Sequence, residues 1–307
     1  MQMLHACGLQ VSDDLIGASE ANPRGAWEDR AIFAEQARLF RAFAVRALPR
    51  PNGWRERTQF DEVKSSLDQI LYDRLSKAKA VWGFKDPKTC LFLPMWEELS
   101  EAHNCDLRFV LCVRRAEDVI ASLMDNYGYG MDLAQSIYFN RNVHAMADCP
   151  ARGFFVHYED LLARDVVVLR QLCWFCGLAT EQSDNDLASI MANICDTELN
   201  RAGGSLDIKL APPVRQLDQK LQNLRGGLLD VERVRREARE LLAPLRHWDF
   251  VIEAARTATL DRGTRPARAR ESSSRLSRTR AEAVRYEPGL RGLWHQITAG
   301  LWGSGGR

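Results

Sequence analysis

The stretch from Leu107 to Leu123, "LRFVLCVRRAEDVIASL", decides the fold. Its first seven residues are almost all apolar, which is typical of a strand in the middle of a parallel sheet. Arg114 and Arg115 end this strand, and "EDVIASLMDNYG" directly after them predicts a helix. The chain therefore places two arginines at the carboxyl end of a buried strand, just before a helix begins.

The same alternation of strands and helices continues on both sides. "AVWGF" (80–84), closed by Lys-Asp-Pro, and "GFFVHY" (153–158) predict two more buried strands. The expected helices cover residues 1–10, about 29–46, 60–78, 90–102 with Pro94 opening or kinking the helix, 159–178, and 214–245 with a break at Gly226-Gly227. This order favours an α/β fold with a parallel, doubly wound sheet. In such sheets ligands bind beyond the carboxyl ends of the strands.

The net charge of +1 conceals two parts of opposite sign. Residues 262–307 hold 10 of the 42 basic residues and 3 of the 41 acidic ones, so they carry about +7 and the rest about −6. We expect a folded domain over 1–261, which is not a general nucleic-acid binder. Residues 262–307 read as a disordered basic tail. Its terminal "GLRGLWHQITAGLW" predicts a short amphipathic helix, with weak membrane-surface contact as an alternative to a solvated tail.

The eight cysteines are scattered among apolar neighbours, as buried free thiols are. Cys173 and Cys176 in "CWFC" have the spacing of a redox pair, but they fall inside a helical pattern, so we expect core packing. No second pair follows at zinc-site spacing, and we expect no metal. The sequence has no apolar run of about 18 residues and no signal-peptide pattern, which favours a reducing cytoplasm.

Arg-x-x-x-Asp-Val-x-x-Ser after an apolar strand resembles the 3′-phosphate segment of the sulfotransferases, which use 3′-phosphoadenosine 5′-phosphosulfate as sulfuryl donor. Here the segment runs from Arg114 to Ser122, with Ala116 where the family commonly has Pro. "WGFKDPKTCLFLPMW" (82–96) is similar to the Lys-Asp-Pro segment of bacterial carbohydrate-type and tyrosyl-protein members. "VHYEDLLAR" (156–164) and "NPRGAWEDR" (22–30) resemble two further family segments. The resemblance covers residues 1 to about 200.

The resemblance implies roles for individual residues. Arg114 and Ser122 would bind the 3′-phosphate of the donor, and Lys85 would be the catalytic cation beside the leaving phosphate. Cytosolic members carry a His base where this chain has Pro87, so Glu28 is the favoured general base. Arg201 is a further candidate for nucleotide binding.

Alternatives stay open for these residues. Glu28-Asp29 at a helix start also suits the helix dipole, Lys85 could be a solvated turn lysine, and Arg114 could pair with Glu117 or Asp118. Asp86 and His157 are alternative bases. Glu159 and Asp160 are expected to start a helix and hold the loop.

The family's fold is a relative of the P-loop kinases, with three layers and a parallel sheet flanked by helices. It normally begins with a strand and a loop of the type Arg-Ser-Gly-Thr-Ser/Thr that cradles the 5′-phosphosulfate. This sequence lacks that loop and any Gly-Lys-Ser/Thr, so we expect the first strand to be missing and an in-frame segment upstream of Met1.

The expected function is sulfuryl transfer to a hydroxyl acceptor, with a carbohydrate or glycolipid favoured over a tyrosyl peptide or small alcohol. The alternatives are an inactive sulfotransferase-like binding module and another P-loop-type phosphotransferase.

Overall fold

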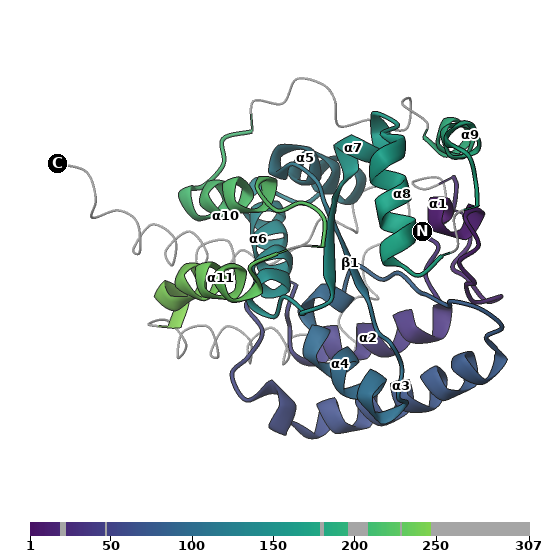
Figure 1. Ribbon diagram of the computed structural model, residues 1–307. Coiled ribbons are helices and arrows are strands. Elements are labelled where there is room, and N and C mark those ends of the chain that lie inside the picture. The colour runs from purple at the N-terminus through teal and green to yellow at the C-terminus, as the bar shows by residue number, and fades with distance from the viewer. Residues whose placement is uncertain (19–22, 47, 179–180, 196–207, 228, 247–307) are drawn as a thin grey trace, which may run out of the picture.

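The computed structural model is mixed α/β and mostly helical (Figure 1). It describes residues 1–18, 23–46, 48–178, 181–195, 208–227 and 229–246. The elements are α1 (Gln2–Ala6), α2 (Arg30–Ala42), η1 (Trp54–Glu56), α3 (Thr58–Lys77), η2 (Thr89–Leu91), α4 (Leu93–Ala102), β1 (Phe109–Val113), α5 (Ala116–Tyr127), α6 (Met131–Ala147), β2 (Gly153–His157), α7 (Tyr158–Leu162), α8 (Val166–Phe175), α9 (Asp184–Ile194), α10 (Pro212–Gln222) and α11 (Val231–Arg246).

The sheet consists of two parallel strands among the described residues. β1 pairs with β2 from Phe109 opposite Gly153 to Val113 opposite His157. The strand expected at 80–84 does not form there; Trp82 makes one isolated parallel bridge with Gln10. Further along this segment, the amide of Asp14 donates a hydrogen bond of 3.1 Å to the Ser12 hydroxyl. The α/β class is therefore confirmed at a coarse level, with a smaller sheet than expected.

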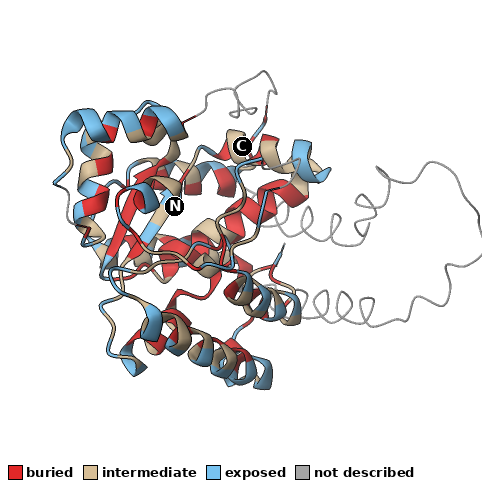
Figure 2. Cartoon of the chain, turned by 90° about the vertical axis from the view of Figure 1, so that its right-hand side faces the viewer, coloured by how far each residue is buried: buried red, intermediate tan, exposed pale blue. Residues whose placement is uncertain are grey.

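Helices cover both faces of the strand pair. Phe154 and Val156 of β2 pack into one apolar cluster with residues of α1, α8 and α9. Phe155 between them joins a second cluster with residues of α5, α6, α10 and α11. This alternation follows from the period of two along a strand, and the buried residues run through the interior between the helices (Figure 2).

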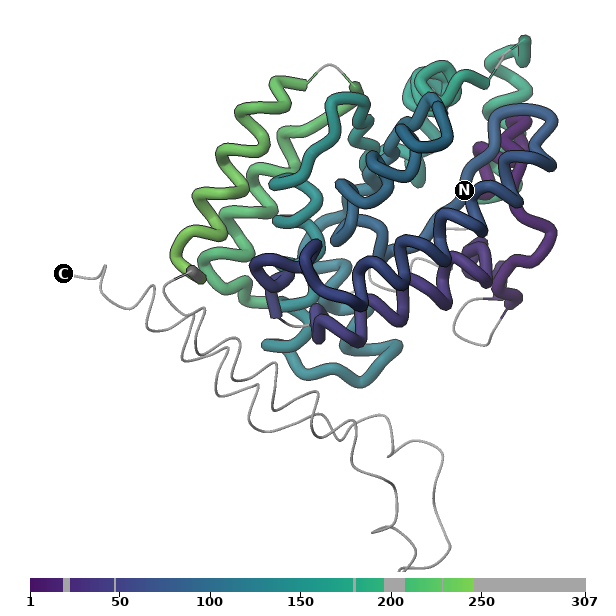
Figure 3. The backbone as a smooth tube through the Cα atoms, turned by 90° about the horizontal axis from the view of Figure 1, so that it is seen from below, coloured from purple at the N-terminus to yellow at the C-terminus, as the bar shows by residue number. Residues whose placement is uncertain are grey.

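A third apolar cluster lies beside the sheet. It joins residues of α2, α3 and α4 to Phe109 at the start of β1, and Figure 3 shows α2 and α3 running alongside each other. Pro94 stands in the first turn of α4, so it opens the helix and does not kink it. This cluster fixes α2, whose first residues follow Glu28, against the segment that carries Lys85.

Three helical features differ from the sequence expectation. The expected helix over 159–178 is two helices, α7 and α8, because Asp165 accepts hydrogen bonds from two amides and caps a new helix start. α6 was not predicted, although 13 of its 17 residues are buried. A helix buried all round loses the one-sided apolar stripe that marks a surface helix. α9 was also missed.

Cys173 on α8 is buried in the core, as expected for the "CWFC" stretch, and Cys176 is partly buried. In the part of the chain that the structure describes, we find no helix that is both long enough and apolar enough to cross a membrane. The expected tail, residues 262–307, lies outside the described residues.

Candidate functional site

Glu28 and Lys85, 57 residues apart in the chain, form an ion pair. The Lys85 Nζ donates a hydrogen bond of 2.7 Å to Glu28 Oε1 and a longer one of 3.3 Å to the carbonyl oxygen of Ala26. The Glu28 side chain is 8% exposed and that of Lys85 is 43% exposed. One cation and one carboxylate thus meet where the ammonium group remains open to solvent.

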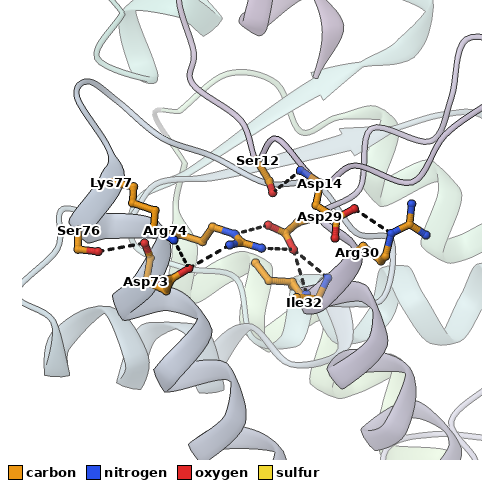
Figure 4. Close-up of polar contacts among 10 residues, drawn as sticks. Ser12, Asp14, Asp29, Arg30, Ile32, Asp73, Arg74, Ser76 and Lys77 are labelled. Atoms are coloured by element: carbon orange, nitrogen blue, oxygen red, sulfur yellow. Dashed lines mark hydrogen bonds and ion pairs between the residues drawn. The ribbon is translucent and has the colours of Figure 1, made fainter.

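The neighbouring acid, Asp29, has a different role (Figure 4). Its Oδ1 accepts hydrogen bonds from the amides of Ala31 (3.0 Å) and Ile32 (3.2 Å), so it is the N-cap of α2. Arg74 of α3 donates to the same carboxylate at 2.7 Å and 3.3 Å. Burial alone would raise the pKa of Asp29, but the hydrogen bonds from Arg74 and Ile32 outweigh it and lower that pKa. Asp29, and not Glu28, therefore fills the role of capping the helix start.

The backbone before these acids is in an unusual conformation. Trp27 has φ +57°, a left-handed value that costs most residues energy. The Trp27 indole nitrogen donates to the carbonyl oxygen of Arg24 at 2.9 Å, and its ring lies 5.3 Å from that of His5. The turn at Trp27 lets two consecutive carboxylates, Glu28 and Asp29, reach different partners.

A buried polar layer supports the Lys85 segment. Asp86 Oδ1 accepts from the backbone amide (2.9 Å) and the Nζ (2.8 Å) of Lys88, and its Oδ2 accepts from Gln36 at 2.9 Å. Burial lowers the pKa of Lys88, against the charge of Asp86. Trp96 of α4 donates to Gln36 at 3.1 Å, which extends the layer into the core. Asp86, one of the alternative bases, is thus engaged in holding this turn.

Arg114 follows β1 and lies over an aromatic ring. Its guanidinium carbon is 4.6 Å from the centre of the Tyr158 ring, a cation–π arrangement. The Arg114 Nε is 3.9 Å from Asp118 Oδ2, at the outer limit of an ion pair, and both side chains are about a quarter exposed. Ser122 stands further along α5 and its Oγ accepts a hydrogen bond of 3.0 Å from Asn126.

Cys112 of β1 is exposed to solvent. Desolvation by the surrounding protein raises the pKa of its thiol. The charges of Lys85 and Arg114 both act on this thiol in the opposite sense. Both cations therefore lie within electrostatic reach of one point on β1.

The loop after β2 takes part as expected. Glu159 and Asp160 stand in the first turn of α7. Glu159 Oε1 accepts a hydrogen bond of 3.1 Å from the amide of Arg115, and Asp160 pairs with Arg225. The Glu159 contact ties the end of β2 to the turn that carries Arg114, and the Asp160 contact ties it to the segment after α10.

The other sequence candidates lie elsewhere. His157, an alternative base, is 1% exposed, and its Nε2 is 2.8 Å from the carbonyl oxygen of Leu224. Arg201 lies outside the described residues. No group of three or more His, Cys, Asp or Glu that could hold a metal ion occurs within the described ranges.

Sequence reasoning missed two residues that support the site, Lys88 and Asp218. Lys88 stands in the same Lys-Asp-Pro segment, but a lysine near a turn gives no sign of being buried. Asp218 follows Leu217 on the apolar flank of α10. The sequence around it gives no sign that this side chain contacts another element.

Comparison with known proteins adds no relative to these observations. No protein-family model matches the chain, and neither a curated protein nor a solved structure matches it.

Proposed function

We propose that this chain is a sulfotransferase that moves a sulfuryl group from 3′-phosphoadenosine 5′-phosphosulfate to a hydroxyl acceptor, with a carbohydrate or glycolipid as the favoured class. The observation that carries the proposal is the 2.7 Å pair of Glu28 and Lys85. Each residue comes from a different segment that resembles the family. Their meeting supports a shared catalytic role for the two segments.

The pair supplies the groups that the reaction needs. In the transfer, the acceptor oxygen bonds to sulfur as the bond between sulfur and the bridging oxygen breaks, and the phosphate leaves on the nucleotide. Glu28, as a carboxylate, would accept the proton of the acceptor hydroxyl. Lys85, with its ammonium group open to solvent, would stabilise the charge that develops on the bridging oxygen.

Arg114 and Ser122 would hold the donor through its 3′-phosphate. The guanidinium is suited to phosphate oxygens, and the hydroxyl of Ser122 adds a donor. The parallel strands with helices on both faces are compatible with a relative of the P-loop kinases, which is the fold we propose.

A transfer assay tests the proposal. The chain, together with any in-frame segment encoded upstream of Met1, is incubated with donor carrying radiolabelled sulfate and a panel of glycans and glycolipids, and labelled products are separated. We expect transfer by the wild type, and a loss of at least about 100-fold in turnover for Glu28→Gln, in line with the contribution of a general base. Lys85→Ala should also lose activity.

Lys77→Ala is the matched control for Lys85→Ala. Lys77 also pairs with a carboxylate, Asp73, at 2.9 Å, and it stands in the last turn of α3. It should keep wild-type turnover. Full activity of Glu28→Gln would show that Glu28 is not the general base. Absence of any transfer by the wild type would contradict the proposed sulfotransferase activity.

A further inference from the structure

The backbone at the start of α5 depends on side chains from other elements. α5 begins at Ala116, and its N-cap, Arg115, supplies no side-chain cap. The first amides of a helix have no partner within it, so each needs an acceptor. Two carboxylates are the acceptors. Glu159 accepts a hydrogen bond from the Arg115 amide and Asp218 Oδ1 accepts one from the Ala116 amide, each at 3.1 Å.

Asp218 reaches this point from α10, 102 residues further along the chain. Figure 1 shows α5, α6 and α10 on the same side of the strands. Its Oδ1 also accepts hydrogen bonds from the Tyr138 hydroxyl of α6 at 2.7 Å and from Gln222 at 3.3 Å. One carboxylate oxygen therefore joins three helices.

The surroundings make this contact hard to replace. Ala116 is fully buried, so water has little access to the amide if the carboxylate is removed. Burial, reinforced by the charge of Asp218, raises the pKa of Tyr138, so the phenol remains a hydrogen-bond donor at neutral pH.

We propose that Asp218 is a positioning residue for the anion site formed by Arg114 and Ser122. Arg114 stands two residues before Ala116 and Ser122 six residues after it, so the first turn of α5 sets the spacing between guanidinium and hydroxyl. Asp218 fixes that turn without contacting the ligand. This inference rests on the proposed function, because the ligand of the site is the 3′-phosphate of the donor nucleotide.

The Asp218 carboxylate holds the helix start, but its negative charge also disfavours binding of an anion nearby. Its negative charge lies at the helix N-terminus, the end that attracts anions. Asparagine keeps an oxygen that can accept the Ala116 amide and removes the charge. Asp218→Asn should therefore bind a phosphate ligand more tightly than the wild type, whereas Asp218→Ala should bind it more weakly.

The test is calorimetric titration with adenosine 3′,5′-bisphosphate and adenosine 5′-monophosphate, beside urea unfolding of each variant. We expect Asp218→Ala to lose about 10-fold in affinity for the bisphosphate, the effect of about one lost hydrogen bond, and nothing for the monophosphate. Tyr138→Phe is the matched control, because it removes another bond to the same oxygen. It should lower stability but keep affinity.

The outcomes separate the two claims. Suppose that the wild type binds the bisphosphate. If Asp218→Ala binds it with unchanged affinity, or if Tyr138→Phe loses as much affinity as Asp218→Ala, the positioning role is wrong but the proposed function stands. If Asp218→Ala does not fold, Asp218→Asn decides: binding tighter than that of the wild type supports the role, and equal or weaker binding overturns it. No binding by the folded wild type overturns the proposed function, and the positioning role with it.

Discussion

Loss of charge at the two neighbouring acids, Glu28 and Asp29, should change the free energy of unfolding by different amounts. Asp29→Asn keeps an oxygen for the amides of α2 but removes the charge that faces Arg74. Breaking a fully buried ion pair costs about 3–5 kcal/mol. The Asp29 side chain is 1% exposed but that of Arg74 is 20% exposed. Solvent therefore relieves part of the cost, and we expect about 2 kcal/mol.

Glu28→Gln is the control for this substitution. The partner of Glu28, Lys85, is 43% exposed, so its ammonium group stays hydrated when the carboxylate is lost. We expect a change of less than about 1 kcal/mol in the free energy of unfolding. Asp29→Ala removes the helix cap too, which adds about 1 kcal/mol to the loss in Asp29→Asn.

The assay is urea unfolding followed by circular dichroism, with a common slope for all variants. In thermal unfolding of the same variants, the loss of about 2 kcal/mol in Asp29→Asn should lower the melting temperature by roughly 4–8 °C. If Asp29→Asn unfolds within about 0.5 kcal/mol of the wild type, the size of a neutral surface change, the cap-and-pair role is wrong. A loss as large for Glu28→Gln would mean that Glu28 serves the fold.

Three further predictions concern binding, acid stability and thiol reactivity. Arg114→Ala should weaken binding of adenosine 3′,5′-bisphosphate by about 10- to 150-fold in calorimetry, the value of a charge-assisted phosphate contact, and an unchanged dissociation constant would refute the assignment. Because the pKa of Asp29 is lowered from its ordinary 3.8, its ionised form contributes stability at neutral pH that is lost as the pH falls through the lowered pKa. The stability difference between wild type and Asp29→Asn should thus shrink as the pH falls below about 4 in urea titrations, and a constant difference would contradict this. Burial raises the pKa of Cys173 to about 12, so at neutral pH this thiol should add nothing to the reaction of the native protein with Ellman's reagent. Wild type and Cys173→Ser should therefore release the same amount of product before unfolding, and one fewer rapidly reacting thiol in Cys173→Ser would show that the core is open there.

The parts of the fold that could be predicted from sequence are those whose pattern is local. The apolar run at Phe109–Val113, the strand at Gly153–His157 and the apolar stripe of α3 each carry their signal within a few residues. The strand expected at 80–84 depended on a partner, and its partner segment offers only Gln10. α6 escaped prediction because buried polar residues such as Asn140 and His144 interrupt its apolar pattern.

The candidate site shows the same division. Motifs could nominate Glu28 and Lys85 separately, but only the fold shows that they meet. The sequence left the choice between base and helix cap open for Glu28, and the geometry gives the cap to Asp29. Asp218 could not be found from the chain alone, because its acceptor role depends on a contact across 102 residues. Local sequence patterns indicate which residues are candidates for the site, whereas contacts between distant segments decide how those residues are positioned.

The most direct test of the account measures whether this chain selects a 3′-phosphate. The wild-type protein is titrated in a calorimeter with adenosine 3′,5′-bisphosphate and, separately, with adenosine 5′-monophosphate. If Arg114 and Ser122 bind the 3′-phosphate as we propose, the bisphosphate should bind at least about 10-fold more tightly. Equal affinity for the two nucleotides, or no binding of the bisphosphate, would contradict it.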